Sequence, residues 1–282
     1  MLDREEYVEQ TYFFRTLIER LKENVPMQES LATLRDEVLA TTRLPLAIDF
    51  MLGELKHVGG FGSALERLAH YFSRFQAFVV TAAEDDHSRF DMRVALLVLT
   101  RLADYMSKEA APQGVFLYQF EAISRNRLNY DRGLAAVADD PIFSSEWRDW
   151  ILMVRRQIGI VGLAELVYVR SQYYQNQRES REGRTLPLEK PILFGEKEGK
   201  IALANRQKDP LLLFAAMQRQ LGYPVVPRPE KPDAAPELVP QLARRMERLE
   251  LRVKLLEEEQ RGGIDITKFY DKGAPPPNGS AR

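Results

Sequence analysis

The stretch VEQTYFFRTLIERLK, residues 8–22, sets the pattern that runs through most of the chain. Its apolar residues recur at spacings of three and four, the period of an α-helix that buries one face. Charged residues fill the opposite side, at Arg15, Glu19 and Lys22. The stretch therefore predicts an amphipathic helix with a buried face made of Val8, Phe14, Leu17, Ile18 and Leu21.

The same spacing continues to about residue 178 and predicts a mainly α protein. We expect a multi-helix bundle over residues 1–184, because amphipathic helices joined by short turns bury their apolar faces against one another. Helix pairs of about 35 residues keep an α-solenoid as the alternative architecture. Beyond the first helix, further helices are expected over residues 28–40, 45–57, 63–84, 89–108, 113–131, 145–157 and 159–178.

Residues 185–222 depart from this pattern and predict a small appendage. The segment EKPILFGEKEGKIALA (189–204) places two apolar runs around a charged, glycine-containing turn, which predicts a β-hairpin. A short helix follows, since Asp209 can cap it, Pro210 suits its first position and Gly222 can end it. The appendage is thus expected to combine a hairpin with one helix.

Residues 223–240 contain six prolines and predict an extended, semi-rigid linker. Residues 241–261 then follow a heptad repeat with apolar residues at the first and fourth positions. In this register Arg245 and Arg252 would face Glu250 and Glu257 across a parallel pair of helices. The repeat predicts a coiled-coil homodimer through Val239, Leu242, Met246, Leu249, Val253 and Leu256.

Two alternatives stay open for this C-terminal part. A second apolar stripe at Leu251 and Leu255 would suit a solitary helix that packs on its own domain. Residues 262–282 form a flexible tail in which a short apolar segment has the composition of a peptide that docks on a protein partner. The same segment would equally suit folding back on its own domain, or disorder. It consists of Ile264, Ile266, Phe269 and Tyr270.

Composition excludes several classes of protein. The formal net charge is -1, so no global field attracts nucleic acid or an anionic membrane, and we expect neither as a partner. The chain has no cysteine, which excludes disulfides and thiolate metal ligands. Its apolar runs are shorter than the about 20 residues that span a bilayer, and its acidic start is unlike a signal peptide. We therefore expect a cytoplasmic protein.

A metal site is the sharpest chemical hypothesis, because Glu54 with His57 and Glu84 with His87 form two Glu-x-x-His pairs. Helical di-iron proteins use this spacing. One helix over residues 63–84 would be about 33 Å long, at about 1.5 Å per residue, and would hold the two histidines near opposite ends. This geometry predicts no shared metal, which leaves Glu66 and His70 as a two-ligand fragment.

Other local motifs also fall short of a catalytic or cofactor site. The glycines at 59, 60 and 62 precede a helix and could hold a phosphate on free N–H groups, yet they follow no strand and lack the P-loop lysine. Asp139-Asp140-Pro141 predicts a solvated turn. The arginines and tyrosines of residues 167–185 are accompanied by Glu179 and Glu182, which favours a polar helix end over a nucleic-acid surface.

The absence of a catalytic set, together with the heptads and the linker, favours a non-enzymatic interaction or scaffold protein. We expect no cofactor, no metal and no catalytic residue. The alternative is a helical-bundle enzyme or a ligand- or metal-binding protein. Its site would be assembled from residues distant in sequence, which local motifs do not reveal.

Overall fold

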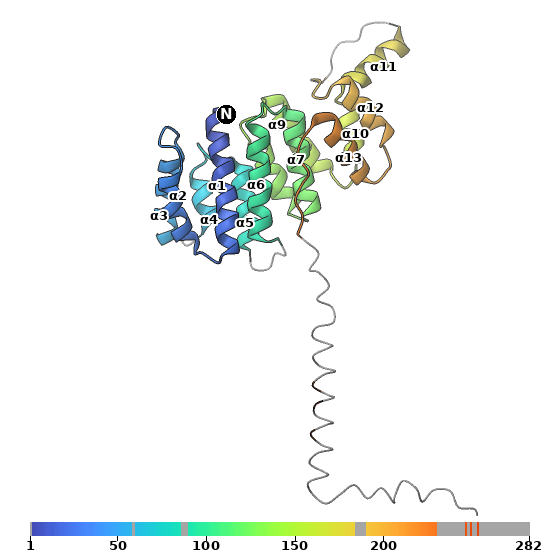
Figure 1. Cartoon of the computed structure of the whole chain (residues 1–282). Coiled ribbons are helices and arrows are strands. Elements are labelled where there is room, and N and C mark those ends of the chain that lie inside the picture. Colours follow the sequence, from blue (N-terminus) through green and yellow to red (C-terminus); the bar gives the residue numbers. More distant parts are fainter. Residues whose placement is uncertain are drawn as a thin grey trace, which may run out of the picture. The chain divides into compact units, whose positions relative to one another are not determined.

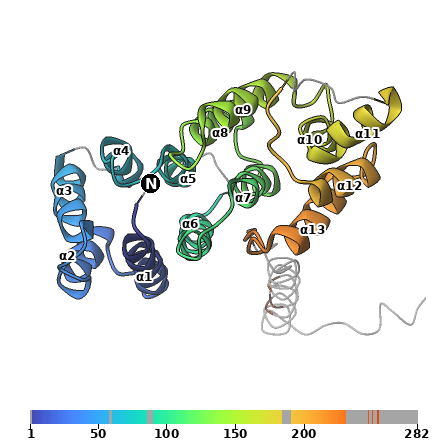
Figure 2. The ribbon, with the colours of Figure 1, turned by 90° about the horizontal axis from the view of Figure 1, so that it is seen from above.

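Helices make up nearly all of the computed structural model, which describes residues 2–57, 60–85, 90–183 and 190–229, and Met246, Leu249 and Val253. The chain divides into two units, residues 1–229 and 230–282. Thirteen helices and no sheet occur in the described part of the chain, so the prediction of a mainly α, multi-helix protein is confirmed. Figure 1 labels the helices of the first unit except α8, which is labelled in Figure 2.

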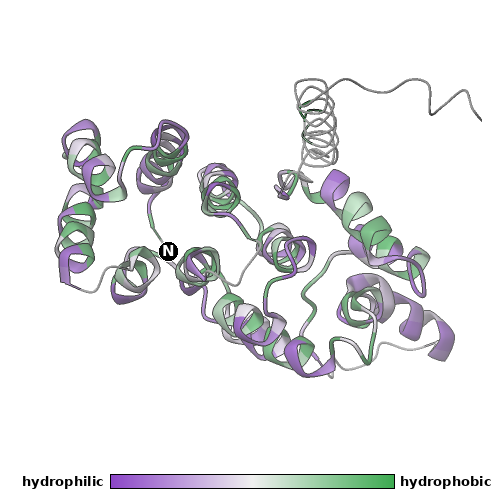
Figure 3. Ribbon diagram, turned by 90° about the horizontal axis from the view of Figure 1, so that it is seen from below, coloured by the Kyte–Doolittle hydropathy of each residue, from purple (hydrophilic) through white to green (hydrophobic). Residues whose placement is uncertain are grey.

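Two rows of helices face each other in the first unit, as Figure 2 shows. The hydrophobic sides of many helices are turned toward the space between the rows (Figure 3). One row contains α2 (Met27–Glu37), α1 (Arg4–Lys22), α6 (Met92–Met106), α7 (Pro112–Arg125) and α13 (Pro210–Leu221). The other contains α3 (Leu44–His57), α4 (Phe61–Arg67), α5 (Arg74–Glu84), α8 (Tyr130–Ala138) and α9 (Ser145–Gln157). The remaining helices are α10 (Leu163–Tyr168), α11 (Gln172–Glu182) and α12 (Glu196–Ala204).

The order of the helices within a row differs from their order in the chain. Helix α1 packs between its sequence neighbour α2 and the distant α6, and α5 packs beside α8. The chain reaches α6 only after it has built α3, α4 and α5 in the opposite row. Contacts between helices far apart in sequence therefore hold the N-terminal part of the unit together.

Helix α1 buries a face that differs from the expected one. Phe14 and Leu17 are fully buried as predicted, whereas Val8 is 48% exposed, so its placement in the core was wrong. The face includes Gln10, which is fully buried, and Phe13. The reason is that α1 has neighbours on both sides within its row, which covers positions that a simple apolar stripe leaves to solvent.

The single helix expected over residues 63–84 was wrong, because the chain breaks between α4 and α5 and these helices pack against each other. A capping box begins α5: the Ser73 hydroxyl accepts from the Gln76 backbone N–H, and the Gln76 side chain accepts from the Ser73 N–H. The helices expected over 113–131 and 159–178 are also interrupted. Asn129 caps the new helix α8, and Ser171 caps α11.

The predicted β-hairpin was also wrong. Its second apolar run lies in α12, where Glu196 and Lys200 form an i,i+4 ion pair of 2.6 Å. Gly199, which we interpreted as part of a turn, allows close packing instead: a Cβ there would lie 2.7 Å from the Tyr173 Cβ of α11. The first run, residues 192–194, is extended and bonds to residues 170–172. Tertiary contact with α11 therefore decided the conformation of both runs.

The short helix that was expected before Gly222 is α13, and its ends match the prediction. The Asp209 side chain accepts from the Leu211 N–H, Pro210 is the first helical residue, and Gly222 adopts a φ of 67°. The compact unit continues through residue 229, past the domain boundaries that we expected at residues 184 and 222. Residues 230–240 of the expected linker lie outside the described residues.

Candidate functional site

The predicted self-association residues that the structure describes are Met246, Leu249 and Val253. All three have helical backbone, and their exposed fractions are 61%, 60% and 53%. The heptad spacing of these residues, rather than their exposure, distinguishes them, since Leu46 of the first unit is 73% exposed. The other predicted self-association positions (Val239, Leu242 and Leu256) and the docking positions (Ile264, Ile266, Phe269 and Tyr270) lie outside the described residues.

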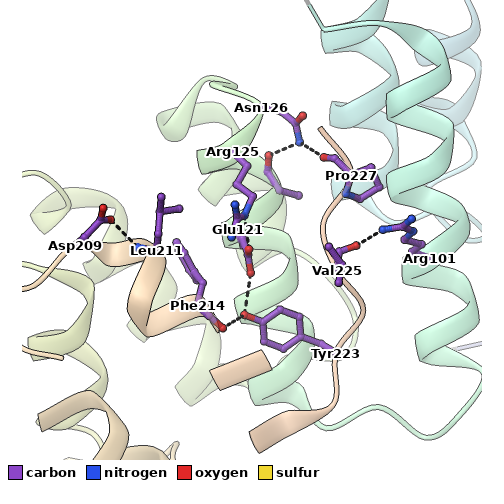
Figure 4. Close-up of polar contacts among 11 residues, drawn as sticks. Arg101, Glu121, Arg125, Asn126, Asp209, Leu211, Phe214, Tyr223, Val225 and Pro227 are labelled. Carbon is purple, nitrogen blue, oxygen red and sulfur yellow. Dashed lines mark hydrogen bonds and ion pairs between the residues drawn. The ribbon is translucent and has the colours of Figure 1, made fainter. Parts of the chain in front are cut away.

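Residues 222–229 form an extended segment, here called the C-terminal strap, that lies on α6 and α7 (Figure 4). Arg101 Nη1 of α6 donates to the Val225 carbonyl at 2.5 Å, and Asn126 Nδ2 donates to the Pro227 carbonyl at 3.1 Å. Tyr105 Oη donates to the Leu221 carbonyl at 3.1 Å, just before the strap. Side chains of two helices therefore hold the backbone of the strap.

Tyr223 is the buried anchor of the strap. Its hydroxyl lies 2.8 Å from Glu121 Oε2 and 3.0 Å from the Phe214 carbonyl, and its ring packs edge-on against Tyr118. Burial and the neighbouring Glu121 carboxylate raise the pKa of Tyr223, so the hydroxyl keeps its proton. Glu121 also pairs with Arg125. The first residues of the expected linker are thus part of the folded unit.

The histidine pairs do not assemble a metal site in the described residues. Our argument against a shared metal assumed an unbroken helix over residues 63–84, and that assumption was wrong. Glu54 nevertheless pairs with Arg67 at 2.8 Å, and His57 is exposed. His87 lies outside the described residues. Within residues 2–57, 60–85, 90–183 and 190–229, no group of three or more His, Asp or Glu side chains could hold a metal ion.

Glu66 pairs with Arg74 at 3.6 Å. The glycine turn before α4 is also occupied by a side chain of the protein itself: the Glu84 carboxylate accepts from the Phe61 N–H at 2.5 Å and the Gly62 N–H at 2.9 Å. The Gly62 N–H is one of the groups that we considered for phosphate binding, and Glu84 occupies it. A Cβ at Gly62 would lie 2.8 Å from this carboxylate, so glycine permits the close approach.

A polar cavity of about 400 Å³ lies between the two rows of helices. Its apolar wall comes from α6, which contributes Leu102, Ala103 and Met106. Arg43 and His70 line it with exposed side chains, whereas the polar residues deeper in the protein come from α1, α5, α7 and the turn after α8. These deeper residues are Tyr7, Gln76, Gln119 and Asp140. The cavity is within the size range of small-molecule sites.

Several polar groups around this polar cavity satisfy one another. Gln76 Nε2 donates to Gln10 Oε1 at 2.8 Å, and Gln10 Nε2 donates to the Tyr71 carbonyl at 3.4 Å. Glu6 Oε1 accepts from the Arg43 backbone N–H at 3.0 Å and from its guanidinium at 3.3 Å. Burial, followed by the adjacent Glu6 carboxylate, raises the pKa of Tyr71. These residues form a polar frame, in which Glu6 Oε2 and the Tyr71 hydroxyl have no hydrogen-bond partner among the described residues.

Asp140 and Gln119 form a second pair of buried polar residues in the wall of this cavity. Asp140 is 6% exposed and accepts from Gln119 Nε2 at 2.9 Å and from the Ile142 N–H at 3.4 Å. Burial raises the pKa of Asp140, while the bonds from Gln119 and Ile142 act in the opposite direction. Gln119 is fully buried, and its Oε1 has no hydrogen-bond partner in the described part of the chain.

The prediction of a solvated turn over residues 139–141 was wrong for Asp140, which is buried. Asp139 is solvated and pairs with Arg148 at 2.9 Å, but its neighbour Asp140 points into the protein. Sequence reasoning missed Gln10 and Gln119 as well. A signal was present at Gln119, which interrupts the apolar run 115–120 and lies two residues before Glu121. A polar residue inside such a run requires a buried partner.

The tyrosines of the arginine-rich segment are engaged by side chains of the same unit. Lys200 Nζ lies 5.4 Å from the ring centroid of Tyr173, and the Tyr168 and Tyr174 rings are 5.2 Å apart. None of the helices in the described ranges is both long and apolar enough to span a bilayer. No family model, curated protein or solved structure matches this chain in the three comparisons with known proteins.

Proposed function

We propose that the protein is a non-enzymatic interaction or scaffold protein of the cytoplasm that self-associates through residues 241–261. The observation that carries this proposal is the exposure of Met246, Leu249 and Val253 on helical backbone. A monomer leaves these side chains in water, whereas a second copy in parallel register would bury them as knobs in the facing helix. The net charge of -1 is the reason for assigning no nucleic-acid or membrane partner.

Hydrogen bonds from Arg101 and Asn126 hold the Val225 and Pro227 carbonyls on the first unit. A coiled coil of about three heptads is marginal on its own, so pairing of two copies would need additional contacts. In this proposal the dimer presents two tails, whose Ile264, Ile266, Phe269 and Tyr270 bind a protein partner.

Light scattering coupled to size-exclusion chromatography tests self-association. The full chain is expected to elute as a dimer, and Met246→Asp/Leu249→Asp is expected to elute as a monomer. The matched control Leu251→Asp/Leu255→Asp removes the same amount of apolar surface from the second stripe and should remain dimeric. A monomeric full chain would contradict the proposal. Dissociation by the control alone would favour a helix that uses the second stripe.

The tail requires a separate experiment. Affinity capture with the full chain should recover a protein partner that is lost with Ile264→Asp/Phe269→Asp, while light scattering still reports a dimer. A partner retained by this variant would show that residues 262–282 are not the docking segment. The alternative function, a ligand-binding helical domain, is supported by the polar cavity.

A further inference from the structure

Another cavity, of about 380 Å³, lies beside α9 and α10, and we call it the α9–α10 cavity. Its apolar wall includes Met153 of α9, Leu166 of α10 and Val169, which follows α10. Arg170 and Lys190 also line it. The α9–α10 cavity therefore combines an apolar wall with two cationic side chains.

Arg170 is a partly buried cation without an anionic partner in the described part of the chain. Its Nη1 donates to the Pro191 carbonyl at 3.3 Å. Its Nε is enclosed by protein atoms, so only the terminal nitrogens of the guanidinium can reach a ligand. Burial lowers the pKa of Arg170, and no neighbouring carboxylate counters this effect. The partly buried Arg20, in contrast, pairs with Glu37 at 2.6 Å.

Two carboxylates also line the α9–α10 cavity, Glu146 and Asp149, but neither neutralises Arg170. Glu146 accepts from the Ser144 hydroxyl at 2.6 Å, and Asp149 is exposed. Their negative charges disfavour a ligand with several anionic groups, because like charges brought close together repel one another. A ligand with a single negative charge would therefore fit the cavity best.

The main chain holds Arg170 in place. Its carbonyl accepts from the Leu193 N–H at 2.9 Å and from the Phe194 N–H at 3.1 Å. The next residue, Ser171, caps α11 by accepting from the Tyr174 N–H at 3.2 Å. A cationic side chain on an anchored backbone is partly pre-organised, which reduces the entropy lost when a ligand binds.

We propose that the α9–α10 cavity binds a small monocarboxylate with an apolar body. The ligand carboxylate accepts from Arg170 Nη2 and Lys190 Nζ, and the apolar body packs on Met153, Leu166 and Val169. Charge-assisted hydrogen bonds from two cations favour a carboxylate over a neutral amide of the same shape. The volume of about 380 Å³ is sufficient for an acid of the size of 3-phenylpropanoate.

Isothermal titration calorimetry on the full chain tests the proposal with 3-phenylpropanoate and its neutral analogue 3-phenylpropanamide. The acid should bind, and the amide should bind about 10-fold more weakly or not at all. Arg170→Gln should weaken binding of the acid about 10-fold or more. The control is Arg15→Gln, which removes the same charge from an exposed position on α1 and should change the dissociation constant less than about 2-fold.

A second variant covers the case in which Arg170→Gln loses its helical circular dichroism. Lys190→Gln alters an exposed side chain and should weaken binding of the acid several-fold. Unchanged binding by Lys190→Gln would overturn the proposal. So would no binding of the acid at millimolar concentration, equal binding of the amide, or equal effects of the Arg170 and Arg15 substitutions. None of these results depends on the coiled coil, so failure here is distinguishable from failure of the proposed self-association.

Discussion

Helix α7 contributes to two interior regions of opposite character. On one, Phe116 packs against Trp150 with ring centroids 4.8 Å apart, within an aromatic cluster that includes Trp147 and Phe194. On the other, Gln119 lines the polar cavity beside Asp140. The aromatic cluster gains stability from area burial and ring contacts. The polar cavity has partly unsatisfied groups, which a protein selected only for stability would replace. The two regions therefore differ in the share of polar side chains that each buries.

The largest expected effect lies in the aromatic cluster. Trp150→Ala should lower the free energy of unfolding by about 3–5 kcal/mol, because it removes a fully buried indole that contacts three aromatic rings and leaves a cavity. Urea denaturation followed by circular dichroism measures this change. Arg156→Ala, on the exposed side of α9, should stay within about 0.5 kcal/mol of the wild type. Equal effects of the two substitutions would contradict the importance of the cluster.

A substitution in the polar frame should lower the free energy of unfolding by less than Trp150→Ala does. Gln10→Ala removes the acceptor of Gln76 Nε2 and the donor to the Tyr71 carbonyl, so it should lower the free energy of unfolding by about 1–3 kcal/mol. The same denaturation experiment measures it. Arg15→Ala on the exposed face of α1 provides the control and should be nearly neutral. A neutral Gln10→Ala would mean that the Gln10–Gln76 pair contributes little.

The smallest effect should have the opposite sign. Burial raises the pKa of Asp140 above its ordinary value of 3.8, so the folded state binds its proton more tightly than the unfolded state does. The stability that this proton provides is present at pH values below 3.8 and is lost as the pH rises through the folded-state pKa. Asp140→Asn should therefore stabilise the protein at pH 7.

This gain from Asp140→Asn should shrink as the pH is lowered, in thermal unfolding recorded between pH 7 and pH 4. Asp139→Asn should show no such pH-dependent gain, because Asp139 is exposed and paired with Arg148. A gain that grows on acidification would contradict the sign that we assign.

Local sequence signals were reliable at the ends of α13. Asp209, Pro210 and Gly222 define the ends of α13 by capping and backbone geometry, which need no distant partner. The capping box at Ser73 was equally local but was overlooked, because apolar spacing continues through the break between α4 and α5. Periodicity alone therefore does not locate a tight turn between two helices of similar pattern.

The residues of the candidate site could not be brought together from local sequence patterns. Gln119 and Asp140 are 21 residues apart, and Gln10 and Gln76 are 66 apart. Each looks like an ordinary polar residue in its own segment, and only the packing of α1, α5 and α7 around one space makes them neighbours. Gly199 is a second example, because it lies in α12 and packs closely against Tyr173 instead of forming the expected turn.

The sequence by itself determined the helical character, the ends of several helices and the heptad spacing of Met246, Leu249 and Val253. These features follow from periodicity and capping, which depend on residues within a few positions of one another. Only the tertiary structure decided that α1 lies beside α6, that residues 196–204 are helical and that Asp140 is buried. The physical reason is that the burial of a helix face depends on which distant helix packs against it. The local sequence of one helix does not specify that neighbour.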